Sequence, residues 1–146
     1  MEDKELALLL LENFNIFDNT IKNITGTGMK KVQKFTTKQF FTLEQMKKYE
    51  KIELKNLSKE LYVSTSSLCI LLNKLVEADY VFREEDSKDR RNTFYGLTDL
   101  GKKALEEEED RVTSLLVEHM SNFDEKFKKN LEKSLMVLIK AIEKLS

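Results

Sequence analysis

Apolar residues recur at helical intervals near both ends of the chain. Over residues 2–24 they fall every three or four positions, at Leu6, Leu10, Phe14, Phe17, Ile21 and Ile24. Over residues 123–145 the same intervals hold, at Phe127, Leu131, Leu135, Leu138, Ile142 and Leu145. This spacing places apolar side chains on one face of an α-helix, so we predict a long helix in each range. We expect Gly26-Thr27-Gly28 to end the first helix, and Ser121 or Asn122 to cap the last.

Three shorter helices are predicted between these ends. The first covers 37–48, with Thr36 or Thr37 as its N-cap. Its inward residues would be Phe40, Phe41, Leu43 and Met46. The second covers 54–61, and the third begins at the N-cap Ser64 and ends near Ala78-Asp79. Their leucines share one face in each helix: Leu54, Leu57 and Leu61, then Leu68, Leu71, Leu72 and Leu75.

The pattern changes over residues 80–97. Aromatic and β-branched residues flank the polar stretch 83–92, which is typical of a β-hairpin with a charged tip. Thr98-Asp99 then caps a long helix to about Met120. These elements predict a mainly α-helical protein, in which a helix-turn-helix is followed by a small β-hairpin wing. Within one domain, 1–146, we expect a winged helix-turn-helix lobe at 35–100.

The terminal helices, in 1–30 and 101–146, hold more apolar surface than so small a lobe can cover. A second stripe on the first helix, at Leu8, Leu9 and Leu11, calls for a further neighbour. We expect a second copy of the chain to cover this surface. The predicted dimerisation contacts are Leu6, Leu10, Phe14, Leu131, Leu135, Leu138 and Ile142.

The second helix of the helix-turn-helix is the predicted recognition helix, which would enter the major groove of DNA. Its candidate DNA-binding residues are Ser64, Thr65, Ser66, Ser67, Ile70, Asn73 and Lys74. Serine and asparagine can hydrogen-bond base edges, and lysine can reach guanine or phosphate. On a helical wheel, the residues that point away from the leucines are Ser66, Cys69, Ile70, Asn73 and Lys74. A thymine methyl would be the natural partner of Ile70 on this outward face. The alternative is that Ile70 is an isolated exposed apolar residue, which is common.

The hairpin tip is the second candidate contact. Three of the four arginines of the chain lie on this hairpin. Arginine suits a narrow groove or a phosphate better than lysine does. The predicted wing contacts are Arg83, Lys88, Asp89, Arg90 and Arg91, with Asp89 orienting the arginines. The alternative is a solvated loop held by internal salt bridges.

Composition narrows the class of protein. One cysteine, Cys69, excludes an internal disulfide, and one histidine excludes a multi-histidine metal site. The longest apolar run, Leu6–Leu11, is too short to span a membrane, and the acidic N-terminus does not resemble a signal peptide. We therefore expect a cytoplasmic protein. The consecutive acids 106–110 point in different directions on a helix and are interpreted as a solvated face, so no metal or cofactor is predicted.

Charge is distributed unevenly although the net charge is only −1. Residues 30–60 carry nine lysines against four glutamates, whereas both ends are acidic. Such a chain could offer a basic middle surface to a polyanion. No nucleophile–base motif or glycine-rich phosphate loop occurs, and we predict no enzyme activity.

The chain from about Phe35 to Gly101 resembles the MarR-type transcriptional regulators, and the resemblance is tightest over 57–101. The stretch 57–68 is similar to the helix-turn-helix of that family, and 75–81 to its passage into the wing. Asp89-Arg90-Arg91, followed by Leu97-Thr98-Asp99-Leu100-Gly101, resembles the Asp-Arg-Arg…Leu-Thr-x-x-Gly wing signature.

The resemblance implies a homodimer bound to a near-palindromic operator in double-stranded DNA. Recognition helices would enter successive major grooves and wings the flanking minor groove. The resemblance also allows a small aromatic effector in a cleft between the dimer helices and the DNA-binding lobe, although we assign no ligand site from the sequence. Candidate lining residues are Phe14, Phe17, Phe40, Phe41 and Tyr49, which could equally be core.

The chain departs from the family pattern at a few positions. Ile70 stands where a basic residue is frequent, which favours an A·T-rich operator or weaker affinity. Tyr62 and Asp79 stand where glycine is frequent, and a left-handed backbone would strain tyrosine more than aspartate. Cys69 could be a redox switch, as cysteines of some relatives are, although a lone cysteine on a helix is more often inert.

The function predicted from the sequence is that of a dimeric DNA-binding transcriptional regulator, which we expect to be a repressor. The alternative is a protein–protein adaptor that keeps the winged-helix shape without binding DNA. The near-neutral lobe and Ile70 favour the adaptor, whereas the arginines of the wing oppose it.

Overall fold

The computed structural model describes residues 1–25 and 34–146. Six helices and three strands follow in the order α1 (Asp3–Thr25), α2 (Thr37–Met46), β1 (Ile52–Glu53), α3 (Leu54–Leu61), α4 (Thr65–Glu77), β2 (Val81–Glu85), β3 (Thr93–Leu97), α5 (Asp99–His119) and α6 (Glu125–Leu145). The predicted mainly α-helical winged-helix fold is confirmed, and α3 has the predicted bounds. The predicted end of α1 at 26–28 lies outside the described residues.

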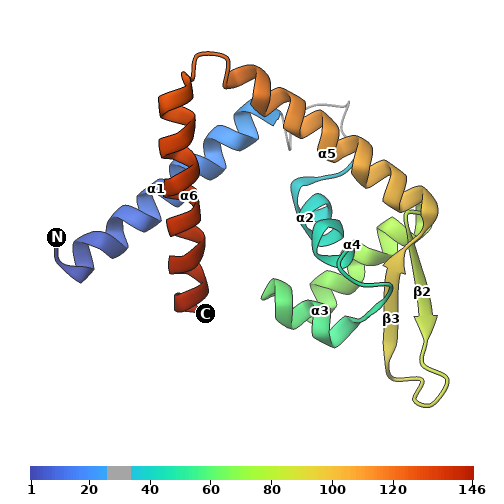
Figure 1. Ribbon diagram of the computed structural model, residues 1–146. Coiled ribbons are helices and arrows are strands. Elements are labelled where there is room, and N and C mark those ends of the chain that lie inside the picture. Colours follow the sequence, from blue (N-terminus) through green and yellow to red (C-terminus); the bar gives the residue numbers. More distant parts are fainter. Residues whose placement is uncertain (26–33) are drawn as a thin grey trace.

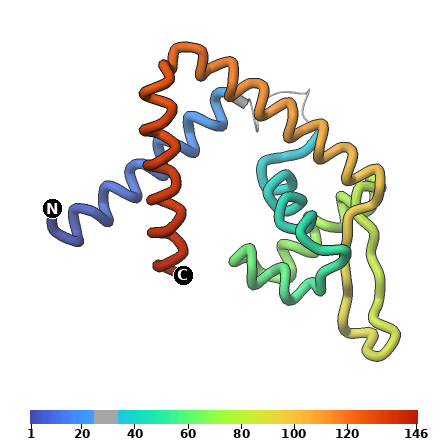
Figure 2. Tube along the Cα trace, in the orientation of Figure 1, coloured from blue at the N-terminus to red at the C-terminus, as the bar shows by residue number. Residues whose placement is uncertain are grey.

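The lobe from α2 to the start of α5 contains the core, and α5 connects it to α1 and α6 (Figure 1). The tube in Figure 2 shows α5 running away from the lobe before the chain turns back into α6. The buried apolar side chains come from all the lobe elements: Phe35, Leu43, Met46, Ile52, Leu57, Leu68, Leu72, Leu75, Val81, Tyr95, Leu97, Ala104 and Leu105. The division into a lobe and a dimerisation region stays a prediction.

Side-chain caps begin α2, α4, α5 and α6, whereas no side chain caps α3. In α2, Thr36 and Gln39 form a capping box, each side chain bonding the other residue's backbone N–H. The Ser64 hydroxyl accepts from the Ser67 N–H at 3.2 Å, as predicted. The predicted cap of the last helix is wrong: Asp124 caps α6, accepting from the Phe127 N–H at 2.7 Å. Its carboxylate also suits the positive end of a helix dipole.

The structure adds one strand that was not predicted and corrects one further expectation. Sequence periodicity did not indicate β1, whose two residues pair with β3 and complete an antiparallel sheet of order β1-β3-β2. So short a strand has no alternation of its own to detect. Phe41 does not point into the core but is 57% exposed, because Leu43 and Met46 fill the inner face of α2.

Tyr62 and Asp79 both adopt the left-handed backbone, with φ of 53° and 64°. Tyr62 ends α3, and Asp79 follows α4. These are the two positions at which glycine is frequent in the family that the sequence resembles. The strain in each is of order 1–2 kcal/mol for a residue other than glycine, and the surrounding turn hydrogen bonds hold it in place.

Gly101 lets α5 approach the start of the wing. A β-carbon at this position would lie 1.9 Å from the carbonyl oxygen of Tyr80. The Thr98 hydroxyl completes the junction, since it accepts from the Gly101 N–H at 2.9 Å and donates to the Asp79 carbonyl at 2.6 Å. The first turn of α5 is therefore locked to the turn between α4 and β2.

Gly101→Ala should destabilise the protein by about 3 kcal/mol, because the added methyl meets backbone that cannot move away cheaply. Ser114→Ala, at an exposed position of the same helix, should change stability by less than about 0.5 kcal/mol. Urea unfolding followed by circular dichroism measures both. Equal stability of the two variants would contradict the close approach.

Candidate nucleic-acid interface

The helix-turn-helix consists of α3, the turn 62–64 and α4. The chain reverses at Tyr62, and the Val63 N–H then donates to the Ser58 carbonyl at 3.1 Å. On the inner face of α4, Leu68, Leu72 and Leu75 are at most 2% exposed. Packing of these leucines fixes which face of α4 looks outward.

The predicted recognition residues all lie on the exposed surface. They are Ser64, Thr65, Ser66, Ser67, Ile70, Asn73 and Lys74. Ile70 is 62% exposed, although it is a large apolar residue. The structure therefore brings hydroxyl, amide, ammonium and aliphatic groups together on one helix face. Their contacts with DNA stay a prediction.

Cys69 corrects the expected helical wheel. It does not point outward with Ile70 but is half-buried between α4 and the sheet. Its Sγ lies 3.9 Å from the Tyr95 hydroxyl and 3.7 Å from the Asn73 Nδ2. The helical wheel omitted the sheet that packs against this side of α4.

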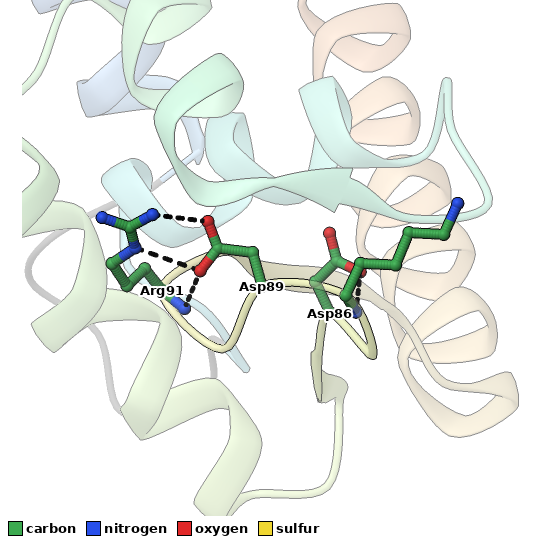
Figure 3. A network of polar contacts seen from close by, with 4 residues as sticks. Asp86, Asp89 and Arg91 are labelled. Carbon is green, nitrogen blue, oxygen red and sulfur yellow. Dashed lines mark hydrogen bonds and ion pairs between the residues drawn. The ribbon is translucent and has the colours of Figure 1, made fainter.

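The wing tip is ordered by aspartates, as Figure 3 shows. Asp89 accepts from the Arg91 backbone N–H at 3.0 Å and from two guanidinium nitrogens, Nε and Nη2, each at 3.1 Å. Asp86 accepts from the Lys88 N–H at 3.0 Å. The Arg91 side chain is nonetheless 87% exposed, so its guanidinium is oriented and still open to a partner. The side chain of Arg91, followed by its backbone N–H, holds the pKa of Asp89 below its usual value.

The other predicted wing cations, Arg83, Lys88 and Arg90, are exposed. Arg83 lies in β2 opposite Tyr95 of β3, whereas Lys88 and Arg90 lie in the tip. Of the wing arginines that Asp89 was expected to orient, the one that it binds is Arg91.

The basic middle segment is partly neutralised by other parts of the chain. Lys34 pairs with Glu107, and the Lys47 Nζ lies 2.6 Å from Glu109. Lys51 pairs with Glu84 at 2.9 Å and also lies over the Phe94 ring, 5.2 Å from its centroid. Sequence charge counts missed these pairs because the acids belong to distant elements.

The acidic stretch 106–110 is consequently more than a solvated face. Glu108 is 5% exposed, and its Oε1 lies 2.5 Å from the Arg111 Nη2. Glu107 and Glu109 bind the lysines of the lobe. Beside Lys47, the Glu44 carboxyl has a raised pKa, caused first by burial and then by Glu109. Within residues 1–25 and 34–146, the acids, cysteine and histidine form no group suited to a metal ion.

Four of the five suggested cleft residues line one cavity of about 380 Å³ between α1, α2 and α5. They are Phe14, Phe17, Phe40 and Phe41, joined by Ile21 and Val112. Tyr49 lies elsewhere, where its hydroxyl donates to Glu60 at 2.5 Å.

The terminal helices expose the residues predicted to form a dimer. Leu6, Leu10 and Phe14 are exposed on α1, and α6 has no buried residue. On α6, Leu135, Leu138 and Ile142 are between 39% and 55% exposed, and Leu131 is half-buried. In the parts of the chain that the structure describes, no helix is long and apolar enough to span a membrane.

This arrangement of a helix-turn-helix, a wing and flanking long helices defines a winged-helix protein of the kind that regulates transcription. The family model of the transcriptional regulators SarA/Rot matches residues 26–108, more than half of the chain. The chain therefore belongs to the SarA/Rot family.

Sequence relatives agree with this assignment. The HTH-type transcriptional regulator SarZ of Staphylococcus aureus is 40% identical over 53 residues, which make up 36% of this chain and 36% of SarZ. The family and this relative are transcriptional regulators, not enzymes.

Solved structures share the fold over nearly the whole chain. The regulator BldR from Sulfolobus solfataricus superposes with a TM-score of 0.71 and 24% identity, covering 96% of this chain and 99% of BldR. A mutant of MarR from E. coli, complexed with operator DNA, has a TM-score of 0.69 and 21% identity, covering 94% and 99%. FabT of Streptococcus pneumoniae, in complex with DNA, has a TM-score of 0.66 and 21% identity, covering 99% and 100%. The resemblance to MarR-type regulators is confirmed at the level of the fold.

Asp89→Asn should release the Arg91 guanidinium while the wing turn keeps its shape, because the amide oxygen still accepts from the Arg91 N–H. In the wild type the ion pair should persist as the pH is lowered into the usual range for aspartate. A lowered pKa means that the stabilisation is present above the unfolded pKa and is lost as the pH falls through the folded value.

NMR relaxation of the Arg91 Nε–H, recorded over a pH series, measures how mobile the guanidinium is in the wild type and in Asp89→Asn. Asp89→Ala, which removes the backbone acceptor as well, should also loosen the turn. An Arg91 signal equally mobile in the wild type and in Asp89→Asn would contradict the pair.

Proposed function

We propose that the chain is a homodimeric repressor that binds double-stranded DNA at specific sequences. The observation that carries this proposal is the exposed face of α4, whose polar and aliphatic side chains lie beside a wing with an oriented arginine. A recognition helix inserted into the major groove presents such groups to base edges. A bound dimer excludes other proteins from the same duplex, which favours repression.

Ile70 and the wing would set the base preference. An exposed isoleucine contacts a thymine methyl favourably and gains nothing from guanine. Arg90 and Arg91 suit the narrow minor groove of A·T-rich DNA, where the negative potential is strongest. We therefore propose an operator rich in A·T pairs, near-palindromic because the dimer is symmetric.

Affinity would depend on a limited set of cations. Lys34, Lys47 and Lys51 are engaged by acids of the same chain, which removes them from the basic surface. Lys38, Lys55 and Lys59 remain exposed in the same segment. Together with the wing arginines, they would contact phosphates, and binding should weaken as salt rises.

A second copy would cover the apolar faces of α1 and α6. Exposed apolar patches of this extent typically mark an interface between proteins. The dimer would set its two α4 helices about one helical turn of DNA apart. An effector that prefers a different spacing would release the DNA.

The cavity between α1, α2 and α5 is the proposed effector site. Its phenylalanine lining suits a small aromatic molecule, and its volume of about 380 Å³ is within the range of ligand sites. Because α1 belongs to the proposed dimer region and α2 to the lobe, a molecule bound between them would change the angle between the lobe and the dimer region.

Arg90→Ala/Arg91→Ala should weaken operator binding by about tenfold to a hundredfold, since two charged contacts are lost. The slope of log affinity against log salt should fall by about two. Fluorescence anisotropy at several salt concentrations measures both. The probe is a duplex that the protein itself enriches from a random-sequence library, called the selected duplex below.

Lys140→Ala/Lys144→Ala removes two positive charges from α6 and serves as the control. It should leave affinity and salt slope close to those of the wild type. Failure of the wild type to enrich any sequence, or to prefer it over a scrambled duplex, would contradict the proposal and favour the adaptor.

Leu135→Glu/Ile142→Glu should convert the protein into monomers, because two carboxylates would be buried on the apolar face of α6. Sedimentation equilibrium should show twice 17.1 kDa for the wild type and 17.1 kDa for the variant. Lys133→Glu lies on the opposite side of α6 and should stay dimeric. A monomeric wild type would contradict the proposed dimer.

A further inference from the structure

Tyr95 places a buried hydroxyl between the two proposed DNA-binding elements. Its side chain belongs to the core and is 1% exposed. The ring alone would fill that place, so phenylalanine would serve the core as well. The hydroxyl instead reaches the Cys69 Sγ of α4, at 3.9 Å. A buried hydroxyl without a hydrogen-bond partner is costly, and the Cys69 sulfur is the partner of this one.

Cys69 continues the contact to the outer surface of α4. The Asn73 Nδ2 donates to its Sγ at 3.7 Å, one turn further along the helix. With one amide hydrogen bound to sulfur, Asn73 still has one N–H and its carbonyl oxygen for a base. Adenine presents the matching groups at its major-groove edge, because its N7 accepts a hydrogen bond and its N6 amino group donates one. The thiol therefore limits the orientations in which Asn73 can meet DNA.

Arg83 stands at the other end of this chain of contacts. It is the cross-strand partner of Tyr95 in the β2–β3 ladder, so both side chains lie on the same face of the sheet. Burial, and then the contact with Cys69, raise the pKa of the Tyr95 hydroxyl, whereas Arg83 acts in the opposite direction. Arg83 itself is exposed.

We propose that the Tyr95 hydroxyl is a positioning group that, through Cys69, couples Asn73 of the recognition helix to Arg83 of the wing. The proposal rests on the proposed DNA-binding function and deepens it. Four side chains from α4, β2 and β3 then form one connected polar chain, and each end of it carries a group for DNA. Neither Tyr95 nor Cys69 would touch the duplex.

The physical consequence is that the two DNA contacts depend on each other. When Asn73 binds a base, Cys69 and Tyr95 are held in the arrangement that orients Arg83, and the reverse is also true. Without the hydroxyl, α4 and the wing would still pack through their apolar residues, but each contact would form independently. Such dependence is measured by a double-mutant cycle.

The test compares four proteins, namely wild type, Asn73→Ala, Arg83→Ala and the double variant, in two backgrounds. The first background is unchanged and the second carries Tyr95→Phe. Dissociation constants for the selected duplex and for a scrambled duplex are measured by anisotropy. In the unchanged background, the fold-loss of affinity in the double variant should differ from the product of the fold-losses in the two single variants by about three- to tenfold. In the Tyr95→Phe background this factor should fall below about two.

Two variants separate positioning from stability. Cys69→Ala breaks the same chain from the helix side without altering β3, and should abolish the coupling as Tyr95→Phe does. Tyr80→Phe removes the hydroxyl of another tyrosine of the lobe, which is half-buried and whose ring packs on Phe35, and should leave the coupling unchanged. A general loss of packing would lower affinity for both duplexes and would not remove the coupling selectively.

The possible outcomes are distinct. Coupling that vanishes in both Tyr95→Phe and Cys69→Ala and persists in Tyr80→Phe supports the proposal. Specific binding with no coupling in the wild type, or with equal coupling in all backgrounds, overturns the positioning role and leaves the proposed function standing. A wild type that does not prefer the selected duplex over the scrambled one overturns both.

Discussion

Burial of one leucine face of α4 is the constraint on which the rest of the lobe depends. Leu68, Leu72 and Leu75 are almost completely buried, and each contributes roughly 2 kcal/mol of apolar burial. Since side chains three and four residues apart share a face, burying this set turns Ile70 and Asn73 outward. The core of the lobe thus determines which side chains α4 presents to the proposed DNA partner.

The junction with α5 transmits this arrangement to the rest of the chain. Gly101 and Thr98 attach the first turn of α5 to the turn before the wing. Further along the same helix, Glu107 and Glu109 bind lysines of the lobe. One helix therefore carries both a close backbone contact and ion pairs with the lobe. A change in its direction would move α4 and the wing together.

The same ion pairs change the electrostatic picture. A count of charges assigns the lobe a strongly basic segment, yet three of those lysines face acids brought from α5 and β2. The basic surface available to the proposed DNA partner is consequently concentrated on the wing and on fewer lysines. In the proposed complex, this distribution would make DNA binding more dependent on the arginines, whose planar groups are suited to the minor groove.

Local signals in the sequence were sufficient for the helices, the hairpin, the caps at Ser64 and Thr98, and the exposed face of α4 apart from Cys69, and they narrowed the cap of α2 to Thr36 or Thr37. Each depends on residues within a few positions of one another, so periodicity and capping chemistry determine it. Tertiary structure decided the pairing of β1, the exposure of Phe41, the partners of the lysines, and the position of Cys69 between α4 and Tyr95. These features depend on contacts between residues far apart in the chain, and no local pattern encodes which distant side chain will arrive.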